Sequence, residues 1–400
     1  MRATTCCIAG GGPAGMMLGL LLARAGVPVV VLEKHADFLR DFRGDTIHPS
    51  TLEVMHELGV LDDFLKLPHQ KVRELVVQID DVRLPVADFT HLPTRCGFIA
   101  FMPQWDFLNF LAERARRYPT FELRMRAEVT GLIEEAGRVV GVEVDTPEGR
   151  LEVPATLVIA ADGRHSVVRR EAGLRIEELG APMDVLWFRL ARRPEDAVGG
   201  LGRFTAGRLF IMLNRGEYWQ CGFVIAKGTI DEIRQAGLEA FRAEVASLAA
   251  VPRDRVSDIR SWDDVKLLTV LVDRLPTWYR SGLLCLGDAA HAMSPVGGVG
   301  INLAIQDAVA AANILAAPLR DGSLSLEHLQ QVQRRRLPAT RIVQRLQILV
   351  QDRIVTPVLG SRARKLSVPL ALRLLVRIPL LRRIPGRLVG MGVRPEHVRI

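Results

Sequence analysis

Near its N-terminus the sequence reads Thr5-Cys6-Cys7-Ile8-Ala9-Gly10-Gly11-Gly12-Pro13-Ala14-Gly15, a short apolar run followed by a glycine-rich turn. Gly10, Gly12 and Gly15 have the G-x-G-x-x-G spacing of a dinucleotide-binding unit. In that motif the first glycine permits a tight turn, the second lets the backbone approach a pyrophosphate, and the third lets the helix pack closely on the strand. The spacing therefore predicts a strand, a turn and a helix at a dinucleotide site.

The residues that follow complete this unit. Residues 14–25 are predicted to form a helix that ends at Gly26, a residue suited to a helix C-terminus. A second apolar strand over 29–32 leads to Glu33, 18 residues after Gly15. A carboxylate at this place can accept a hydrogen bond from a ribose hydroxyl. Taken alone, the unit leaves open which dinucleotide binds.

Length and composition indicate a globular protein with more than one domain. A chain of 400 residues exceeds one simple core, and 48% hydrophobic with 24% charged residues is typical of a folded protein. The sequence has no uninterrupted run of 18 apolar residues and no signal-peptide pattern, so we expect neither a membrane span nor export. The five cysteines form no C-x-x-C pair and are expected to be reduced core residues of a cytoplasmic protein, without a metal site.

The rest of the chain mixes strand and helix patterns. The predicted strands are 72–79, 82–86, 97–101, 123–134, 138–145, 149–154, 157–161, 183–191, 208–214, 217–226 and 283–286, and those from 123 to 154 are expected to form a meander. The predicted helices are 50–58, 104–117, 230–250, 301–317 and 325–350. Ser50 with Glu53, and Thr229 with Glu232, have capping-box spacing and are expected to open two of these helices.

Three predicted strands end in an acidic residue, namely Glu33, Asp162 and Asp288. Ligands of open α/β sheets lie beyond the carboxyl ends of the strands. A single aspartate at such a place is commonly a turn former or a helix N-cap. Three such acids, two of them beside a glycine, indicate a ligand site.

Three motifs in this order resemble the signatures of the para-hydroxybenzoate hydroxylase-like (group A) flavoprotein monooxygenases. They are Gly10–Gly15, Asp162-Gly163-x-x-Ser166-x-x-Arg169 and Gly287-Asp288-Ala289-Ala290-His291-x-x-x-Pro295-x-x-Gly298-x-Gly300-x-Asn302. The resemblance extends from residue 1 to about residue 320. It implies an α/β fold: a Rossmann-like FAD-binding domain of the glutathione reductase type, an inserted β-sheet substrate domain and a C-terminal helical region.

The domain boundaries expected from the resemblance are discontinuous. The FAD-binding domain would comprise 1–71, 102–179 and 276–320, the β-rich substrate domain 72–101 and 180–275, and the C-terminal helices with the basic tail 321–400. The sequence has no second G-x-G-x-x-G motif, so NADH or NADPH is expected to dock transiently, and the sequence does not distinguish the two.

The resemblance also implies roles for individual residues. Glu33 would bind the adenosine ribose, Gly12 to Gly15 the pyrophosphate, and Asp288 the ribityl chain, while Asp162 is either a ligand or a loop anchor. Free N–H groups where Gly298–Asn302 opens a helix can face the flavin edge that becomes negative on reduction. The residues expected to bind the cofactor are Gly10, Gly12, Pro13, Ala14, Gly15, Glu33, Lys34, Arg43, Gln104, Val129, Asp162, Asp288, Pro295, Gly298, Gly300, Ile301 and Asn302.

The implied reaction consumes NAD(P)H and O₂. FAD is reduced, captures O₂ as a C4a-hydroperoxide and transfers one oxygen to an aromatic or other electron-rich apolar small molecule. His48 is a candidate to hold a phenol proton, with a place in a loop or helix flank as the alternative. The candidates for substrate contact are Phe210, Met212, Tyr218 and Pro295, although strand aromatics are commonly core residues.

Two other functions remain open at this point. One is a quinone-pathway hydroxylase or lipid reductase that works at a membrane surface. The other is an FAD-bound redox sensor or partner protein without catalysis. A monomer or a homodimer is expected in either case, and no nucleic-acid-binding module is recognisable.

The positive charge of the chain is concentrated at its C-terminal end. The net charge is +8, and residues 361–400 alone contribute +9. Their arginines interleave with apolar residues, and Pro379 and Pro385 are expected to interrupt any helix. Two arrangements are open: the segment lies on an anionic bilayer, with the protein peripheral at the inner membrane surface, or its leucines pack on the body and its arginines stay in water.

Overall fold

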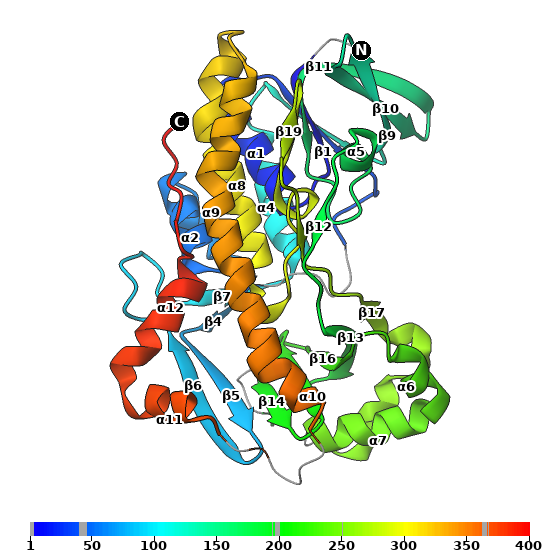
Figure 1. Cartoon of the computed structure of the whole chain (residues 1–400), viewed down its shortest axis with the longest axis vertical. Coiled ribbons are helices and arrows are strands. Elements are labelled where there is room, and N and C mark those ends of the chain that lie inside the picture. Colours follow the sequence, from blue (N-terminus) through cyan, green and yellow to red (C-terminus); the bar gives the residue numbers. More distant parts are fainter. Residues whose placement is uncertain are drawn as a thin grey trace.

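The computed structural model of the chain describes residues 4–39, 46–193, 195–196, 201–249, 251–361, 366 and 368–400. Figure 1 shows an elongated molecule with one sheet and its helices at one end and a second sheet at the other. The long helix α9 (Leu326–Val350) runs beside both parts. All five cysteines are free and buried.

The first sheet is centred on β1 (Thr4–Ala9) and has the strand order β19-β20-β11-β1-β2-β8. The strands from β20 to β8 in this order pair in parallel. Helices cover the faces of parallel sheets, which explains why β1 and its neighbours are apolar along their central length. The other strands are β2 (Val29–Glu33), β8 (Phe121–Met125), β9 (Glu128–Glu135), β10 (Arg138–Thr146), β11 (Gly149–Ala160), β19 (Tyr279–Arg280) and β20 (Leu283–Cys285).

Four helices pack against one another beside this sheet. Helix α1 (Pro13–Arg24) contacts both α4 (Gln104–Ala115) and α8 (Gly300–Arg320), and α8 also contacts α9. The segment Val296–Arg320 is long and apolar enough to cross a membrane, but 72% of its most apolar part is buried inside the molecule. It is a core helix of this fold.

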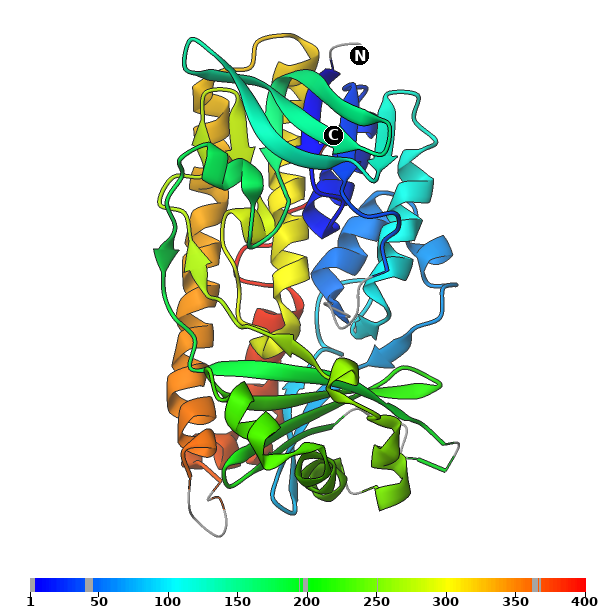
Figure 2. The same ribbon diagram turned by 90° about the vertical axis from the view of Figure 1, so that its right-hand side faces the viewer.

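The second sheet has seven strands in the order β17-β13-β16-β15-β14-β5-β6. Figure 2 shows it below the first sheet, and α6 (Ile230–Ala236) and α7 (Leu238–Ala249) lie on the face that points away from the first sheet. These helices cover a core that includes Phe188, Phe210 and Phe241. The strands are β5 (Glu74–Ile79), β6 (Val82–Asp88), β13 (Met183–Ala191), β14 (Leu201–Thr205), β15 (Arg208–Asn214), β16 (Tyr218–Ala226) and β17 (Lys266–Leu268).

Shorter elements join the two parts. Strands β3 (Thr46–Ile47), β4 (Gln70–Val72) and β7 (Ile99–Phe101) form a small sheet, and β12 (Glu177–Glu178) pairs with β18 (Asp273–Arg274). The helices of this group are α2 (Pro49–Glu57), α3 (Leu61–Phe64) and α5 (Val167–Glu171). After α9 come a π-helical turn (Gln351–Val355), α10 (Thr356–Leu359), α11 (Leu370–Arg377), a 3₁₀ turn (Pro379–Arg382) and α12 (Arg383–Gly390).

Two strand predictions differ from the structure, and several strands were not predicted. The predicted strand 123–134 is two strands, β8 and β9, because the extended conformation is interrupted at Arg126, whose φ is 54°. The predicted strands 149–154 and 157–161 are one continuous strand, β11, which pairs with β10 first and with β1 and β20 afterwards. Strand β14 was not predicted, and neither were the short strands β3, β12, β17, β18 and β19.

Four details of the predicted helices also differ from the structure. The N-cap of α2 is His48, with Pro49 in the first turn, so Ser50 lies inside the helix and does not cap it. Helix 230–250 is two helices, because Gly237 between them has a φ of 92°. The Thr229 hydroxyl donates to the carbonyl of Ala226, so the second predicted capping box does not form either. Pro385 lies in the first turn of α12, where a proline costs no hydrogen bond, and therefore does not interrupt that helix.

Candidate active site

One cavity of about 1310 Å³ extends from the carboxyl edge of the first sheet to one face of the second sheet. At the first sheet its lining includes Gly12, Glu33 and Asp288. At the second sheet its lining includes Val185 and Ile211. The motifs and the β-rich insert thus face the same space.

The glycine turn after β1 has the geometry that its spacing predicts. Gly10 has a φ of 103°, and a Cβ there would lie 2.4 Å from the Ala161 carbonyl oxygen. A Cβ at Gly15 would lie 2.0 Å from the Gly10 carbonyl oxygen, so only glycine allows α1 to pack this closely on the strand. A Cβ at Gly12 would meet no atom within 4 Å. At Gly10 and Gly15 the turn therefore packs directly against other backbone atoms, whereas at Gly12 it has free space on the cavity side.

Glu33 ends β2 and is 8% exposed. Its carboxylate accepts hydrogen bonds from the backbone N–H groups of Gly11 and His35, each at 3.0 Å. The next residue, Lys34, lines the cavity with its ammonium 3.9 Å from Glu128. The strand end and the glycine turn are therefore fixed to each other.

The Asp162 side chain has the hydrogen bonds of a loop anchor, one of the two roles that its sequence left open. Its Oδ2 accepts hydrogen bonds from the N–H groups of Val167 (2.8 Å) and Val168 (3.2 Å), so this oxygen caps α5 and anchors the loop. Its Oδ1 is buried and has no partner in the described part of the chain. Burial raises the pKa of this carboxyl. A ligand that donates a hydrogen bond would satisfy the second oxygen.

Two arginines join the second motif to the third. Arg169 donates to the carbonyl oxygens of Ala289 (3.1 Å) and Arg164 (2.7 Å). Arg164 lies in the cavity wall, with its guanidinium 3.6 Å from the Asp288 carboxylate. The second and third motifs, more than 100 residues apart in sequence, therefore form one wall of the cavity. This shared position explains why the two motifs occur together.

The third motif forms a loop that leads into α8. Gly297 and Gly298 have φ values of 80° and 63°, which favour glycine, and both line the cavity. A Cβ at Gly298 would lie 2.8 Å from the Thr46 hydroxyl oxygen, and that hydroxyl donates to the Gly298 carbonyl at 2.9 Å. Helix α8 begins at Gly300, so its first N–H groups lie at the cavity wall.

The side chain of Asn302 forms hydrogen bonds with other residues of the protein. Its side-chain oxygen accepts from the His48 N–H (2.8 Å) and the Thr51 hydroxyl (2.7 Å), and its amide donates to the Thr46 carbonyl (3.0 Å). It does not line the cavity. Among the residues expected to bind the cofactor, those that do line the cavity are Gly10, Gly12, Pro13, Ala14, Glu33, Lys34, Gln104, Val129, Asp162, Asp288, Pro295, Gly298, Gly300 and Ile301. Gly15 lies behind the turn, and Arg43 lies outside the described residues.

Three glutamines of α9 and the turn after it support the same loop and were not predicted from the sequence. Gln347 exchanges hydrogen bonds with the Ser294 backbone (3.2 and 2.9 Å) and donates to the Val296 carbonyl (2.9 Å). Gln351 donates to the Ser294 hydroxyl, and Gln344 to the Ala292 carbonyl. All three are at most 4% exposed. Their spacing of three and four residues puts them on one helix face, and this is the signal that could have identified them.

His48 is fully buried and does not line the cavity. Its Nδ1 lies 2.7 Å from the Val389 carbonyl oxygen, and its Nε2 has no partner in the described part of the chain. Burial lowers the pKa of this imidazole to about 4. The side chain is therefore neutral at pH 7 and donates from Nδ1 to the carbonyl.

The substrate end of the cavity is lined by one face of the second sheet. On β15 the lining residues are Leu209, Ile211 and Leu213. Side chains alternate along a strand, so Phe210 and Met212 point to the opposite face and pack under α7. The structure thus places these two substrate candidates away from the cavity. Tyr218 does not line it either, and only Pro295 of the four candidates does.

Gln220 is a polar residue of this face that the sequence did not indicate. It lines the cavity and is 4% exposed. Its Oε1 accepts from Arg215 Nε at 3.1 Å, which fixes the orientation of the amide because a guanidinium cannot accept. The amide nitrogen forms no hydrogen bond with any described residue. Its two N–H groups are available to an oxygen atom in the cavity.

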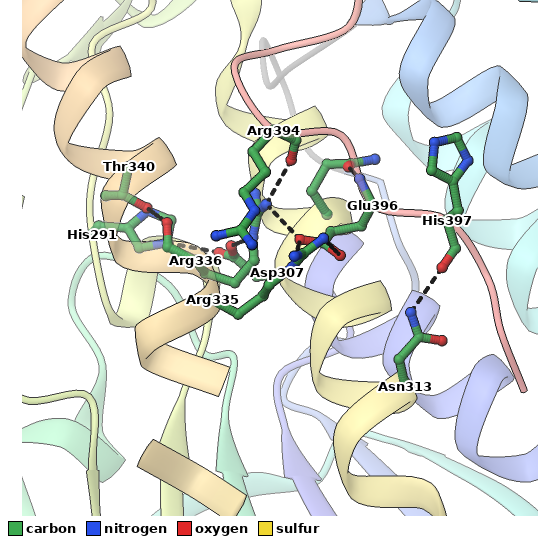
Figure 3. Close-up of polar contacts among 10 residues, drawn as sticks. His291, Asp307, Asn313, Arg335, Arg336, Thr340, Arg394, Glu396 and His397 are labelled. Atoms are coloured by element: carbon green, nitrogen blue, oxygen red, sulfur yellow. Dashed lines mark hydrogen bonds and ion pairs between the residues drawn. The ribbon is translucent and has the colours of Figure 1, made fainter. Parts of the chain in front are cut away.

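A buried charge network connects the third motif to the C-terminal segment (Figure 3). Asp307 of α8 contacts His291 at 2.7 Å and Arg336 of α9 at 2.8 Å. Burial alone would raise the pKa of the Asp307 carboxyl, but the neighbouring His291 and Arg336 lower it. Arg336 also donates to Glu396 at 3.3 Å. The network fixes His291, and with it the loop that leads to Pro295.

Fold and site together define a flavoprotein oxidoreductase with a dinucleotide site at the carboxyl edge of a parallel sheet. The chain matches the family model described as an FAD binding domain over residues 3–346, and it belongs to this family. It is an FAD-dependent monooxygenase of the aromatic hydroxylase type. The family, the fold class and the cofactor predicted from the sequence are confirmed.

The similar proteins include two monooxygenases from Streptomyces. A 6-methylpretetramide 4-monooxygenase of Streptomyces rimosus is 33% identical over 400 residues, which cover 99% of this chain and 94% of that protein. A 12-dehydrotetracycline 5-monooxygenase/anhydrotetracycline 6-monooxygenase of Streptomyces rimosus subsp. rimosus is 29% identical over 325 residues, which cover 76% of this chain and 60% of that protein. The crystal structure of p-nitrophenol 4-monooxygenase from Pseudomonas putida DLL-E4 superposes with a TM-score of 0.79 at 19% identity, covering 98% and 99% of the two chains. The fold is the same.

Proposed function

We propose that this monooxygenase hydroxylates an aromatic compound with several fused rings, using NADH or NADPH and O₂. The observation that supports it is the continuous cavity of about 1310 Å³ that begins at the glycine turn. Its other end, lined by residues of the second sheet such as Val185, Leu209, Ile211 and Leu213, is an apolar chamber. Ligand pockets commonly measure about 300–1,000 Å³, so this cavity has room for the cofactor and a sizeable second molecule. The names of two relatives specify 6-methylpretetramide and tetracycline derivatives as their substrates.

The residues at the first sheet fit FAD. The open position at Gly12 leaves room for a pyrophosphate, and the unpartnered Asp162 oxygen can accept a hydrogen bond. We assign the adenosine ribose to Glu33, the pyrophosphate to Gly12–Gly15, and the ribityl chain to Asp288. When bound there, FAD supplies the redox chemistry and the activation of O₂.

The remaining tasks belong to the chain itself. The N-terminus of α8 presents N–H groups and the positive end of a helix dipole at the cavity wall, and both favour negative charge on a ring placed there. The apolar chamber walls exclude water from the reacting atoms. Gln220 donates a hydrogen bond to a carbonyl or phenolic oxygen and thereby orients the ring system. His48 is neutral and away from the cavity, so we assign it a structural role.

The test is an assay of NADH and NADPH oxidation in air with the purified protein. Anhydrotetracycline is expected to stimulate oxidation strongly and to give a product heavier by one oxygen atom. p-Nitrophenol, a single-ring compound, is expected to stimulate it weakly. Strong stimulation by p-nitrophenol alone would refute the proposed substrate class, and absence of released FAD after denaturation would refute the cofactor.

A further inference from the structure

The C-terminal segment from Leu370 to Leu388 has an unusual surface. Its large apolar side chains are exposed to water in the structure: Leu370 is 72%, Leu380 66% and Ile384 59% exposed, and Leu374, Ile378 and Leu388 are between 38% and 45% exposed. Single exposed apolar residues are common on proteins. Six within 19 residues form a patch, and such patches mark contact sites. The alternative in which the leucines of the tail pack on the body is thus wrong for these side chains.

Helix α11 has two distinct faces. Leu370, Arg373, Leu374 and Arg377 are exposed and share one face, because they are spaced by three and four residues. Leu372 lies on the opposite side of the helix and lines the cavity. One side of α11 therefore contributes to the chamber wall, while the other presents leucine and arginine to the outside.

Helix α12 repeats this arrangement. Gly386 and Gly390 face β6 and the residues after it, so closely that a Cβ would lie 2.0 Å from the Asp88 carbonyl oxygen and 2.6 Å from Leu92. These contacts hold the helix flat on the body. Its outward face then carries Arg383, Ile384, Arg387 and Leu388, all of them exposed. Figure 1 shows α11 and α12 together at one end of the molecule, beside β6.

The charge of this surface identifies its partner. In the described part of the chain, none of the five arginines from Arg373 to Arg387 lies within 4 Å of a carboxylate oxygen. Arg383 contacts His91 at 3.2 Å, and its charge helps to lower the pKa of Asp88. The rest of the protein, residues 1–360, has a net charge of −1, so the positive charge is local to the tail. Arginine and leucine mixed on one outward face are typical of helices that lie in the interface of an anionic membrane.

We propose that α11 and α12 dock this enzyme on the surface of an anionic lipid bilayer. The leucines and isoleucines enter the boundary between headgroups and acyl chains, and the arginines contact the lipid phosphates. The bilayer then lies directly behind the chamber wall formed by Leu372, where an apolar aromatic compound dissolved in the membrane is concentrated. This proposal is independent of the substrate proposed above.

The experiment is flotation of the full-length, FAD-loaded enzyme with vesicles. Vesicles of phosphatidylcholine mixed with phosphatidylglycerol are expected to bind it, vesicles of phosphatidylcholine alone to bind it weakly, and added salt to release it. Arg373→Gln/Arg377→Gln/Arg387→Gln is expected to lower the partition coefficient about a hundredfold. Leu370→Ser/Leu374→Ser/Leu380→Ser is expected to abolish binding. The matched control is Leu267→Ser/Leu326→Ser, two exposed leucines elsewhere (42% and 51%), which is expected to bind like the wild type.

Three outcomes would overturn the proposal. They are absence of binding to anionic vesicles, equal loss of binding in the control variant, and binding that does not depend on the anionic lipid. Sedimentation of the protein without vesicles tests the other possible occupant of this surface, a second copy of the chain. If the wild type is a dimer and the leucine variant a monomer, and neither binds vesicles, the surface is an interface between two copies of the chain. FAD content and thermal unfolding of each variant show whether it is folded.

Discussion

The two ends of the cavity differ in how their walls are held. At the cofactor end, backbone contacts at Gly10 and Gly15 and buried hydrogen bonds of Glu33 and Asp162 fix each loop in one position. At the chamber end, aliphatic and aromatic side chains of one sheet face, among them Ile211 and Trp187, line the wall, and Gln220 supplies a polar contact. The first wall suits one invariant ligand, and the second suits a substrate whose shape can differ between related enzymes.

This comparison explains why the motifs identify the cofactor but not the substrate. A position where a Cβ would lie 2.0 Å from a carbonyl oxygen admits only glycine, so the sequence there is restricted. An apolar wall admits different apolar residues of similar volume at small cost. The substrate end therefore leaves no fixed signature in the sequence.

The largest effect is expected from the glycine turn. Gly15→Val is expected to abolish FAD binding and to destabilise the apoprotein by more than about 3 kcal/mol, because the new side chain collides with the Gly10 carbonyl. The measurements are urea unfolding of the apoprotein and FAD titration by flavin fluorescence. Gly12→Ala is the control: its Cβ meets no protein atom, so stability is expected to stay unchanged while FAD affinity falls. Equal destabilisation by both variants would contradict the distinction.

The second prediction concerns neighbouring residues on β15. Phe210→Ala is expected to destabilise the protein by about 3–5 kcal/mol, because Phe210 is 1% exposed in the core under α7. Ile211→Ala is expected to cost less stability and to raise the KM for the aromatic substrate, because Ile211 faces the cavity. Urea unfolding and steady-state kinetics of both variants are the measurements. The reverse pattern would mean that the other sheet face binds the substrate.

The third prediction is a pH dependence of stability. Because the pKa of His48 is lowered from 6.5 to about 4, the unfolded chain binds a proton between these values that the folded chain does not. Stability is therefore expected to fall with pH from about 6.5 to about 4, by about 3 kcal/mol in total from this group.

The measurement for His48 is the difference in unfolding free energy between the wild type and His48→Asn across this pH range. Asparagine can cap α2 and donate to the Val389 carbonyl, but it does not titrate. The difference removes the contribution of carboxylates common to both proteins. If both proteins lose stability in parallel, His48 is not the group responsible.

The smallest effect is expected at Gln220. Gln220→Leu removes the proposed hydrogen bond to a substrate oxygen. It is expected to lower kcat/KM about tenfold, which corresponds to a loss of about 1.5 kcal/mol of transition-state stabilisation. FAD affinity is expected to stay unchanged, since the residue lies on the second sheet. Gln220→Glu separates the alternatives: a carboxylate cannot donate, so it is expected to be as defective as leucine. Full activity of the glutamate variant would exclude donation by Gln220.

Much of the fold followed from local sequence. The glycine spacing, the apolar run of β2 and the position of Glu33 predicted the first unit correctly, because a parallel strand, a tight turn and a packed helix each restrict the residues that form them. The three motifs identified the family and FAD for the same reason. The assigned roles of individual residues remain predictions, and that of Arg43 lies outside the described residues.

Tertiary structure decided which side chains face the cavity. From the sequence alone, Phe210 and Ile211 are both apolar strand residues, and the face that each occupies depends on which side of the sheet α7 covers. Likewise, His48 and the three glutamines of the α9 region have polar side chains, and only the packing of distant segments shows that they are buried and support the third motif. Sequence determined the glycine turn because steric exclusion acts between near neighbours, whereas the chamber is formed by segments that meet only in the folded chain.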